Sequence, residues 1–168
     1  LPVHVTDRVG EEGRGFRYLL DGMNAERILV AAEALGIGRA AMRRATGYAR
    51  ERVVFKRPIG MNQGVAFPLG EAQMRLDAAE LMIRKASWLI DQGLPCGAEA
   101  NMAKWLAADA AFSAADQAMQ THGGFGYARE FHVERYWREA RVLRLVPISQ
   151  EMVLNYVTEH ILELPRSY

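Results

Sequence analysis

Residues 96–121 read CGAEANMAKWLAADAAFSAADQAMQT, and this stretch decides the fold. Alanine is the strongest helix former, and after Gly97 the stretch contains neither glycine nor proline. Larger apolar residues recur in it at helical spacing, and they are Met102, Trp105, Leu106, Phe112 and Met119. The stretch therefore predicts one long helix.

Two more long helices are predicted before it, over residues 16–50 and 61–92, because apolar residues recur there three and four positions apart. Pro58 and Gly60 separate these helices, since both residue types interrupt a helical pattern. Gly93 stands where a glycine commonly follows a helix end. The three long helices are thus expected to be joined by short turns.

After the alanine-rich helix, THGGFGY (121–127) predicts a glycine turn and VERYWREARVL (133–143) a shorter helix. SQEMVLNYVTEHIL (149–162) predicts the last helix, with Ser149 as its N-cap. No alternating apolar run is long enough for a sheet. The chain is therefore expected to be all-α, an up-down antiparallel helical bundle with a short fourth and a terminal helix, in one domain over residues 1–168.

The composition excludes several classes of protein. A net charge of +1 gives no reason to expect nucleic acid as a partner, and no apolar run approaches the roughly 20 residues that cross a membrane. Cys96 is the only cysteine, so no internal disulfide is possible and a cytoplasmic location is expected. The first residues, LPVHVTDRVGEEG, do not resemble a signal peptide, and the missing initial Met suggests a processed chain or an excised domain.

One carboxylate stands out in LDGMNAERILV (20–30). On a helix, Glu26 shares its face with Met23, Leu29 and Val30, so a carboxylate interrupts an apolar stripe. Glu26 is then a solvated residue, an ion-pair partner, or a base held where water is scarce. Spacing alone favours a structural role, as it does for the glycine pair in THGGFGY, which is more often a simple turn.

Three motifs together carry a resemblance to a known family. They are ERVVFKRPIGMNQ (51–63), NMAKWLAADAA (101–111) and MQTHGGFGYAREFHVERYWREARV (119–142), and the last is the most specific. In this order they resemble the C-terminal domain of the acyl-CoA dehydrogenases, over about Val9 to Ile161. Full-length members also have an N-terminal helical domain and a middle β-domain, which are absent from this chain, so it resembles roughly the last two-fifths of such an enzyme.

The resemblance implies a chemistry. These enzymes bind FAD and an acyl-CoA thioester and oxidise the Cα–Cβ bond to the trans-2-enoyl-CoA. A carboxylate removes the α-proton while a hydride leaves Cβ, and hydrogen-bond donors hold the thioester oxygen. Burial of the carboxylate raises its pKa and its strength as a base. No metal and no nucleophilic triad is required.

The resemblance also implies roles for individual residues. Arg52 matches an arginine that reaches the flavin pyrophosphate from the neighbouring subunit, and arginine suits this role because its fork pairs with phosphate oxygens. Asn24 and Arg27 match positions beside the substrate, although other members often carry aspartate at the position of Asn24. His122 is expected to pack or face solvent rather than to catalyse. The remaining residues with implied FAD contacts are Phe55, Gln63, Gln120, Thr121, His122, Gly123, Gly124, Ser149 and Gln150.

The chain departs from the family where most members carry their base. That position, in the stretch Val146–Ser149, is Pro147, which has no proton to exchange. A branch that includes isovaleryl-CoA and long-chain acyl-CoA dehydrogenases has its base on the first bundle helix instead, in a motif like G-L-D-L-E-R. Gly22–Arg27 (GMNAER) resembles this motif, so Glu26 is predicted to be the base. Glu151 is a weaker candidate because one helix turn, about 5.4 Å, separates it from the expected position.

Pro147 also lacks the main-chain N–H that donates to the thioester oxygen in this family, and loss of one such donor costs about 10²–10³ in rate. Either Ile148 or Ser149 donates instead, or the site is tuned for other acyl groups. The sequence leaves this choice open.

The resemblance finally implies partners. FAD shared between subunits implies a homodimer or homotetramer, and an electron-transferring flavoprotein is the expected acceptor in fatty acid metabolism. Two alternatives stay open: a flavin-dependent oxidase or monooxygenase of the same fold, and a non-catalytic oligomerisation module. The isolated chain is expected to bind FAD poorly and to be inactive.

Overall fold

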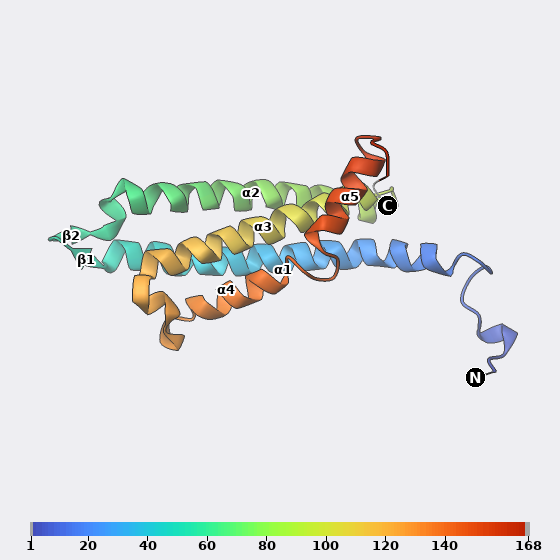
Figure 1. Ribbon diagram of the computed structural model, residues 1–168, viewed down its shortest axis with the longest axis horizontal. Helices are drawn as coiled ribbons and strands as arrows, with labels where there is room; N and C mark the ends of the chain where they lie inside the picture. Colours follow the sequence, from blue (N-terminus) through green and yellow to red (C-terminus); the bar gives the residue numbers. More distant parts are fainter. Residues whose placement is uncertain (1, 167–168) are drawn as a thin grey trace.

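The computed structural model describes residues 2–166 and consists mainly of helices (Figure 1). The five α-helices are α1 (Gly15–Glu51), α2 (Gln63–Asp91), α3 (Gly97–His122), α4 (Val133–Val142) and α5 (Gln150–His160). The three long helices run antiparallel to their neighbours in sequence, α4 packs against α1 and α3, and α5 crosses α3 at one end. The predicted all-α up-down bundle is confirmed.

The helix ends follow the predicted signals. Gly93, just past α2, has a φ of +66°, a conformation that glycine adopts without steric cost. Ser149 caps α5, since its Oγ accepts a hydrogen bond from the Met152 N–H at 3.3 Å. The THGGFGY segment, predicted as a turn, forms the 3₁₀-helix η3 (Gly123–Tyr127), and a second one, η4 (Arg129–Phe131), leads into α4. Two short 3₁₀ turns, η1 (Val5–Asp7) and η2 (Ile59–Met61), precede α1 and α2.

A small hairpin, which the sequence analysis did not predict, joins α1 to α2. Strands β1 (Val53–Val54) and β2 (Arg57–Pro58) pair antiparallel. The two turn residues, Phe55 and Lys56, have φ of +50° and +65°, which is the pattern of a type I′ turn. Strands of two residues are too short to produce a detectable alternation of apolar and polar residues.

The core consists largely of alanine. Thirteen residues of α3 are buried, and nine of them are alanines. Their small side chains let α1 and α2 approach α3 closely, and they are Ala100, Ala103, Ala107, Ala108, Ala110, Ala111, Ala114, Ala115 and Ala118. Gly38 of α1 completes this contact, because a Cβ built on it would lie 3.0 Å from the Ala111 Cα. Small side chains on both helices therefore set the distance between them.

Many larger apolar residues lie outside this core. Of the apolar positions in the predicted pattern, Leu35, Met42, Leu69, Leu76 and Ile83 are buried. Others on the same helices are 58% to 71% exposed, namely Leu19, Phe67, Met74 and Leu81. A periodic pattern identified the helices correctly, but it did not separate core positions from apolar positions on the surface.

Candidate functional site

The residues predicted to contact ligands lie at two places along the bundle. One group surrounds a pocket of about 430 Å³ beside the hairpin. We call it the hairpin-end pocket, and its lining residues are Tyr48, Arg52, Val54, Ile59, His122, Gly124 and Phe125. The structure thus brings Arg52 together with His122 and Gly124, which follow it by 70 and 72 residues in the sequence.

Arg52 reaches this pocket from the end of α1. Its main-chain N–H donates to the Tyr48 carbonyl at 2.8 Å and closes the helix, so the side chain leaves the helix toward the 3₁₀ turn after α3. The guanidinium carbon lies 5.9 Å from the centre of the Phe125 ring. No carboxylate within residues 2–166 pairs with Arg52, which leaves its donors available to an anion.

His122 forms the wall of the pocket. Its ring stacks on Tyr48 with the ring centres 4.4 Å apart, and Nδ1 donates to the Ala118 carbonyl at 2.8 Å. The side chain is buried, with 5% of its surface exposed. His122 therefore packs inside the bundle and does not face solvent.

The backbone after His122 is open to a ligand. Gly123 is exposed with a φ of +59°, and neither Gly123 nor Gly124 has any atom within 4 Å of a built Cβ. A flat ligand group can therefore lie directly against this backbone. Thr121 points inward instead, and its Oγ1 donates to the Gln117 carbonyl at 2.8 Å.

Three other predicted cofactor contacts lie outside the pocket lining. Phe55 is at the tip of the hairpin with 95% of its surface exposed, and Gln63 and Gln120 are exposed residues at the start of α2 and the end of α3.

The second group of predicted residues lies where α1, α3 and α5 meet. Arg27 is 5% exposed, and its Nη1 donates to Asn24 Oδ1 at 2.9 Å. Asn24 and Tyr156 of α5 both lie next to Gly97, at the start of α3. The Nε of Arg27 has no acceptor, and burial lowers the pKa of Arg27, while Tyr156 and Glu26 oppose this effect. An arginine buried with a free donor can bind an additional acceptor.

Glu26 itself is exposed in this chain. Its helix face turns away from the three-helix core, and its neighbour on that face, Leu29, is 70% exposed. The apolar stripe noted in the sequence is thus divided, because Met23 and Val30 are half-buried, and Val30 packs against the core, while Leu29 and Glu26 are exposed. Glu26 would need cover from another part of a larger protein to become a base in a dry site.

The segment before α5 is held from inside by a residue that the sequence analysis did not single out. Lys104 of α3 is fully buried, and its Nζ donates to the Ile148 carbonyl at 2.5 Å. Burial lowers the pKa of Lys104 to about 8. The signal that could have revealed it was a lysine on the alanine-lined face of α3, between Ala103 and Ala107.

Ser149 and Gln150, predicted to contact FAD, follow this segment. The Ser149 hydroxyl caps α5, while Gln150 is buried and its Nε2 donates to the Trp105 carbonyl at 3.4 Å. Trp105 and His122 are 17 residues apart on α3, which corresponds to about 25 Å. The two groups of predicted residues thus lie far apart on one chain.

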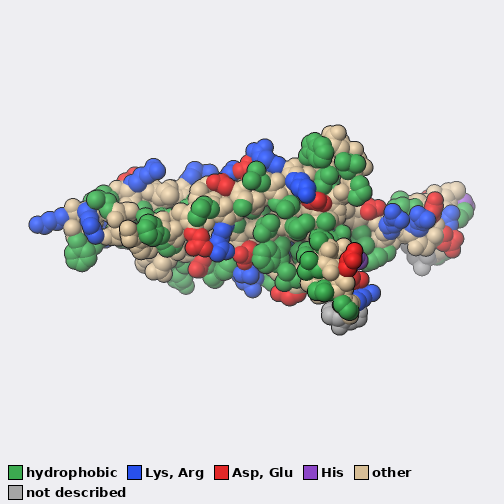
Figure 2. Space-filling model, turned by 90° about the horizontal axis from the view of Figure 1, so that it is seen from above, with side chains coloured by type: hydrophobic (Ala, Val, Ile, Leu, Met, Phe, Trp, Pro, Cys, Tyr) green, Lys and Arg blue, Asp and Glu red, His purple; other side chains and the backbone are tan. Residues whose placement is uncertain are grey.

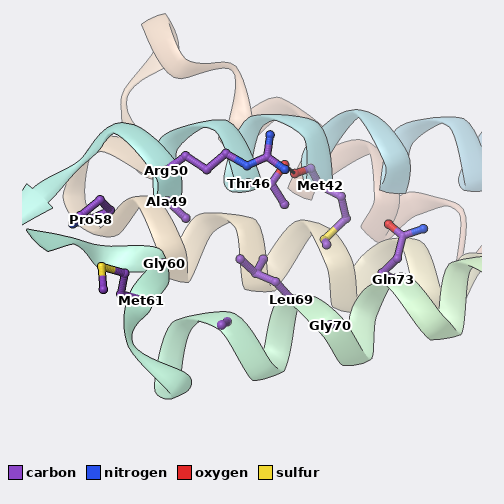
Figure 3. A pocket seen from close by; sticks show the side chains of 11 residues that line it. Met42, Thr46, Ala49, Arg50, Pro58, Gly60, Met61, Leu69, Gly70 and Gln73 are labelled. Carbon is purple, nitrogen blue, oxygen red and sulfur yellow. Dashed lines mark hydrogen bonds between the residues drawn. The ribbon is translucent and has the colours of Figure 1, made fainter.

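A further pocket of about 490 Å³ opens between α1, α2 and the hairpin (Figure 3). Its floor is apolar, with Met42, Ala49 and Leu69, and the side chain of Arg50 runs along its α1 side. None of the predicted site residues lines this pocket. Within residues 2–166 there is no group of side chains that could hold a metal ion, and no helix there is apolar enough over sufficient length to cross a bilayer.

Comparison with known proteins gives a consistent result. The family model for the acyl-CoA dehydrogenase C-terminal domain matches residues 13–162. The chain is 46% identical over 162 residues to the acyl-CoA dehydrogenase FadE12 of Mycobacterium tuberculosis, covering 95% of this chain and 42% of that protein. It thus spans about two-fifths of the length of this relative.

Solved structures agree with this match. Butyryl-CoA dehydrogenase from Megasphaera elsdenii superposes with a TM-score of 0.91 at 34% identity, covering 96% of this chain and 42% of that one. The prolyl acyl carrier protein oxidase AnaB superposes with a TM-score of 0.90 at 29% identity, covering 96% and 43%.

Proposed function

Since the chain belongs to the acyl-CoA dehydrogenase family, as its C-terminal domain, we propose that it is part of an FAD-dependent enzyme that oxidises the Cα–Cβ bond of an acyl-CoA thioester. The product is the trans-2-enoyl-CoA. The observation that carries this proposal is the hairpin-end pocket, where an unpaired arginine, an exposed glycine backbone and an aromatic wall meet.

The residues of this pocket fit FAD. Arg52 offers unpaired donors to a pyrophosphate, and the backbone at Gly123 and Gly124 leaves open space where a Cβ would stand on any other residue. When bound, FAD supplies the acceptor for the hydride from Cβ. Phe55, Gln63 and Gln120 are exposed and extend the contact surface beyond the pocket.

Glu26 is the proposed base, which takes the α-proton of the substrate. Pro147 cannot do so, and Glu26 is the carboxylate next to the buried Arg27. Asn24 and Arg27 are proposed to bind the acyl-CoA, with the free Nε of Arg27 as a donor to it. Water is excluded from Glu26 by parts of the protein outside this chain, because the chain itself leaves this carboxylate exposed.

The enzyme is proposed to be a homodimer or homotetramer. The hairpin-end pocket and the Ser149–Gln150 segment lie about 25 Å apart along α3, which favours contacts with two different FAD molecules and hence a second subunit. An exposed apolar stripe on α2 supports this. Its members are seven residues apart, the spacing of helix–helix seams, and they are Phe67, Met74, Leu81 and Trp88.

Figure 2, which views the molecule from above, shows hydrophobic side chains interspersed with charged ones along this face and gathered most densely toward the end where α5 lies. We further propose that an electron-transferring flavoprotein accepts the electrons from the enzyme. The proposed location is the cytoplasm, and the proposed role is in fatty acid metabolism. The isolated chain is proposed to be inactive, because it leaves Glu26 and the pocket open to water.

Glu26→Gln in the full-length enzyme tests the proposal. The amide keeps the shape of the side chain but cannot accept the proton, so reduction of the flavin by acyl-CoA without oxygen should slow by at least about 10²–10⁴-fold. Absorbance of bound FAD must be unchanged. Glu33→Gln, two turns further along the same helix and also exposed, is the matched control and should reduce normally. Normal flavin reduction in Glu26→Gln would end the assignment of the base.

A second candidate is an oxidase of the same fold, favoured by the likeness to the prolyl acyl carrier protein oxidase. In that case reduced enzyme would release peroxide at the rate of substrate turnover. A non-catalytic oligomerisation module is the remaining alternative, and it would bind neither FAD nor acyl-CoA.

A further inference from the structure

The pocket of about 490 Å³ between α1 and α2, which we call the α1–α2 pocket, has a long apolar wall (Figure 3). The lining residues of each helix extend over two turns, which corresponds to about 10 Å along the helix axis. Its volume lies within the range of small-molecule sites. The apolar side chains of the wall are Met42, Ala49, Pro58, Met61, Ala66 and Leu69. The pocket can therefore hold an extended apolar chain.

Two glycines define the space inside the pocket. Gly60, beside the hairpin, lies so close to α1 that a built Cβ would be 2.9 Å from the Ala49 carbonyl oxygen, so the chain is closely packed at this end. Gly70 of α2 lines the pocket, and no atom lies within 4 Å of a Cβ built on it. The absence of a side chain at Gly70 thus leaves the space beside Leu69 open to a ligand.

The positive charges beside the pocket lie on α1. Figure 3 shows the Arg50 side chain running along α1 toward Thr46. Arg43, two turns before Arg50, lines an adjoining hollow of about 250 Å³ that shares Met42, Thr46 and Gln73 with the pocket. No carboxylate within residues 2–166 pairs with Arg43 or Arg50. Both guanidinium groups are therefore available to an anion near Thr46.

The other polar side chains around this point already have partners. Thr46 Oγ1 donates to the Met42 carbonyl at 2.9 Å, and Gln73 Nε2 donates to Asp77 Oδ1 at 3.0 Å. Arg39, in the adjoining hollow, also pairs with Asp77. The two unpaired arginines are thus the main donors for a ligand, and the fork of a guanidinium group matches the two oxygens of a carboxylate.

We propose that the α1–α2 pocket binds an unesterified fatty acid. The acyl chain lies along the apolar wall, where it is removed from water, and the carboxylate pairs with Arg50 and Arg43. None of the residues predicted to contact FAD or acyl-CoA lines this pocket, so the inference goes beyond the proposed function.

Binding of decanoate to the full-length enzyme with FAD bound tests the carboxylate contact. An excess of an S-alkyl-CoA thioether keeps decanoate out of the acyl-CoA site, and titration calorimetry gives the dissociation constant. Decanoate should bind at least about tenfold more tightly than decanol, which has the same chain without the charge. Arg50→Met should remove most of this difference. Arg44→Met, which replaces an exposed arginine of α1 outside the pocket, is the matched control and should keep it.

Gly70→Leu tests the apolar part of the site. Leucine is a stronger helix former than glycine, and its side chain would extend into the open space, so this variant should fold and bind decanoate at least about tenfold more weakly. Gly36→Leu is the control and should bind normally, because Gly36 is an exposed glycine of α1 outside the pocket with no atom within 4 Å of a built Cβ. If Gly70→Leu does not fold, the comparison of Arg50→Met with Arg44→Met still decides the outcome.

No binding of decanoate to the unmodified enzyme, or normal binding in Gly70→Leu, would refute the proposal. If another subunit fills the pocket, decanoate will not bind and Gly70→Leu will change the size of the oligomer in sedimentation analysis, which also refutes it. Flavin reduction by acyl-CoA is measured on the same enzyme. Its absence together with normal decanoate binding would overturn the proposed function and leave this inference intact.

Discussion

Gly38 of α1 lies against Ala111 of α3 so closely that a methyl group built on Gly38 would be 3.0 Å from the Ala111 Cα. The same methyl group would be 2.6 Å from a methyl carbon of Leu76 on α2. All three long helices thus meet at one glycine, and the spacing of the bundle depends on the absence of a side chain there.

Gly38→Ala should therefore destabilise the chain by about 1–3 kcal/mol, because Leu76 can move aside but the Ala111 backbone cannot. Gly36→Ala is the control, since Gly36 is an exposed residue of the same helix with no atom within 4 Å of a built Cβ. It should stabilise the chain by about 0.5–1 kcal/mol through helix propensity. Chemical denaturation of the 168-residue chain measures both, and an equal effect of the two substitutions would show that the helices are not in close contact at Gly38.

Gly123→Ala should weaken both the fold and FAD binding, because a φ of +59° is unfavourable for alanine and the strain costs about 1–2 kcal/mol. Gly124→Ala introduces no such strain, and its Cβ would lie in open space. Its free energy of unfolding should therefore stay within about 0.5 kcal/mol of that of the unmodified chain. If FAD lies against this backbone, Gly124→Ala lowers FAD affinity without loss of stability. Thermal unfolding and FAD titration of the full-length enzyme separate the two effects.

Leu81→Glu should reduce the size of the oligomer without unfolding the subunit. Leu81 is 71% exposed in the middle of the α2 stripe, and a charge there cannot be buried against a neighbouring helix without a large cost. Leu94→Glu, which is 46% exposed in the turn after α2, should leave the oligomer unchanged. Sedimentation analysis of the full-length enzyme gives the result, and an unchanged oligomer in Leu81→Glu would exclude the α2 stripe from the interface.

Lys104 should make stability depend on pH in the alkaline range. Its pKa is about 8 in the folded chain and 10.5 when unfolded, so between these values the unfolded chain binds more protons. The free energy of unfolding of the unmodified chain should thus rise between about pH 8 and about pH 10.5, by on the order of 3 kcal/mol more than that of Lys104→Met. Below pH 8 the difference between the two chains should not change with pH. Denaturation of both chains over this range measures the difference, and parallel curves would mean that Lys104 is not desolvated.

Much of the fold followed from local patterns. The helix ends at Gly93 and Ser149 were correct because a left-handed glycine and a side-chain cap are properties of a few neighbouring residues. The hairpin at Phe55 and Lys56 was missed because its strands are too short to have a pattern. The burial of individual apolar residues was predicted poorly, since Leu76 and Leu81 fit the same periodicity yet one is buried and the other exposed.

The sequence by itself determined the helices, their order and the residue types available for chemistry, because backbone propensity and apolar periodicity act over a few residues at a time. Only the tertiary structure decided that Arg52 and Gly124 border one pocket, that Glu26 is exposed while Arg27 is buried, and that Lys104 holds the Ile148 carbonyl. Those relationships depend on which helix faces meet, and contacts between residues distant in the chain are fixed by the packing of the whole bundle.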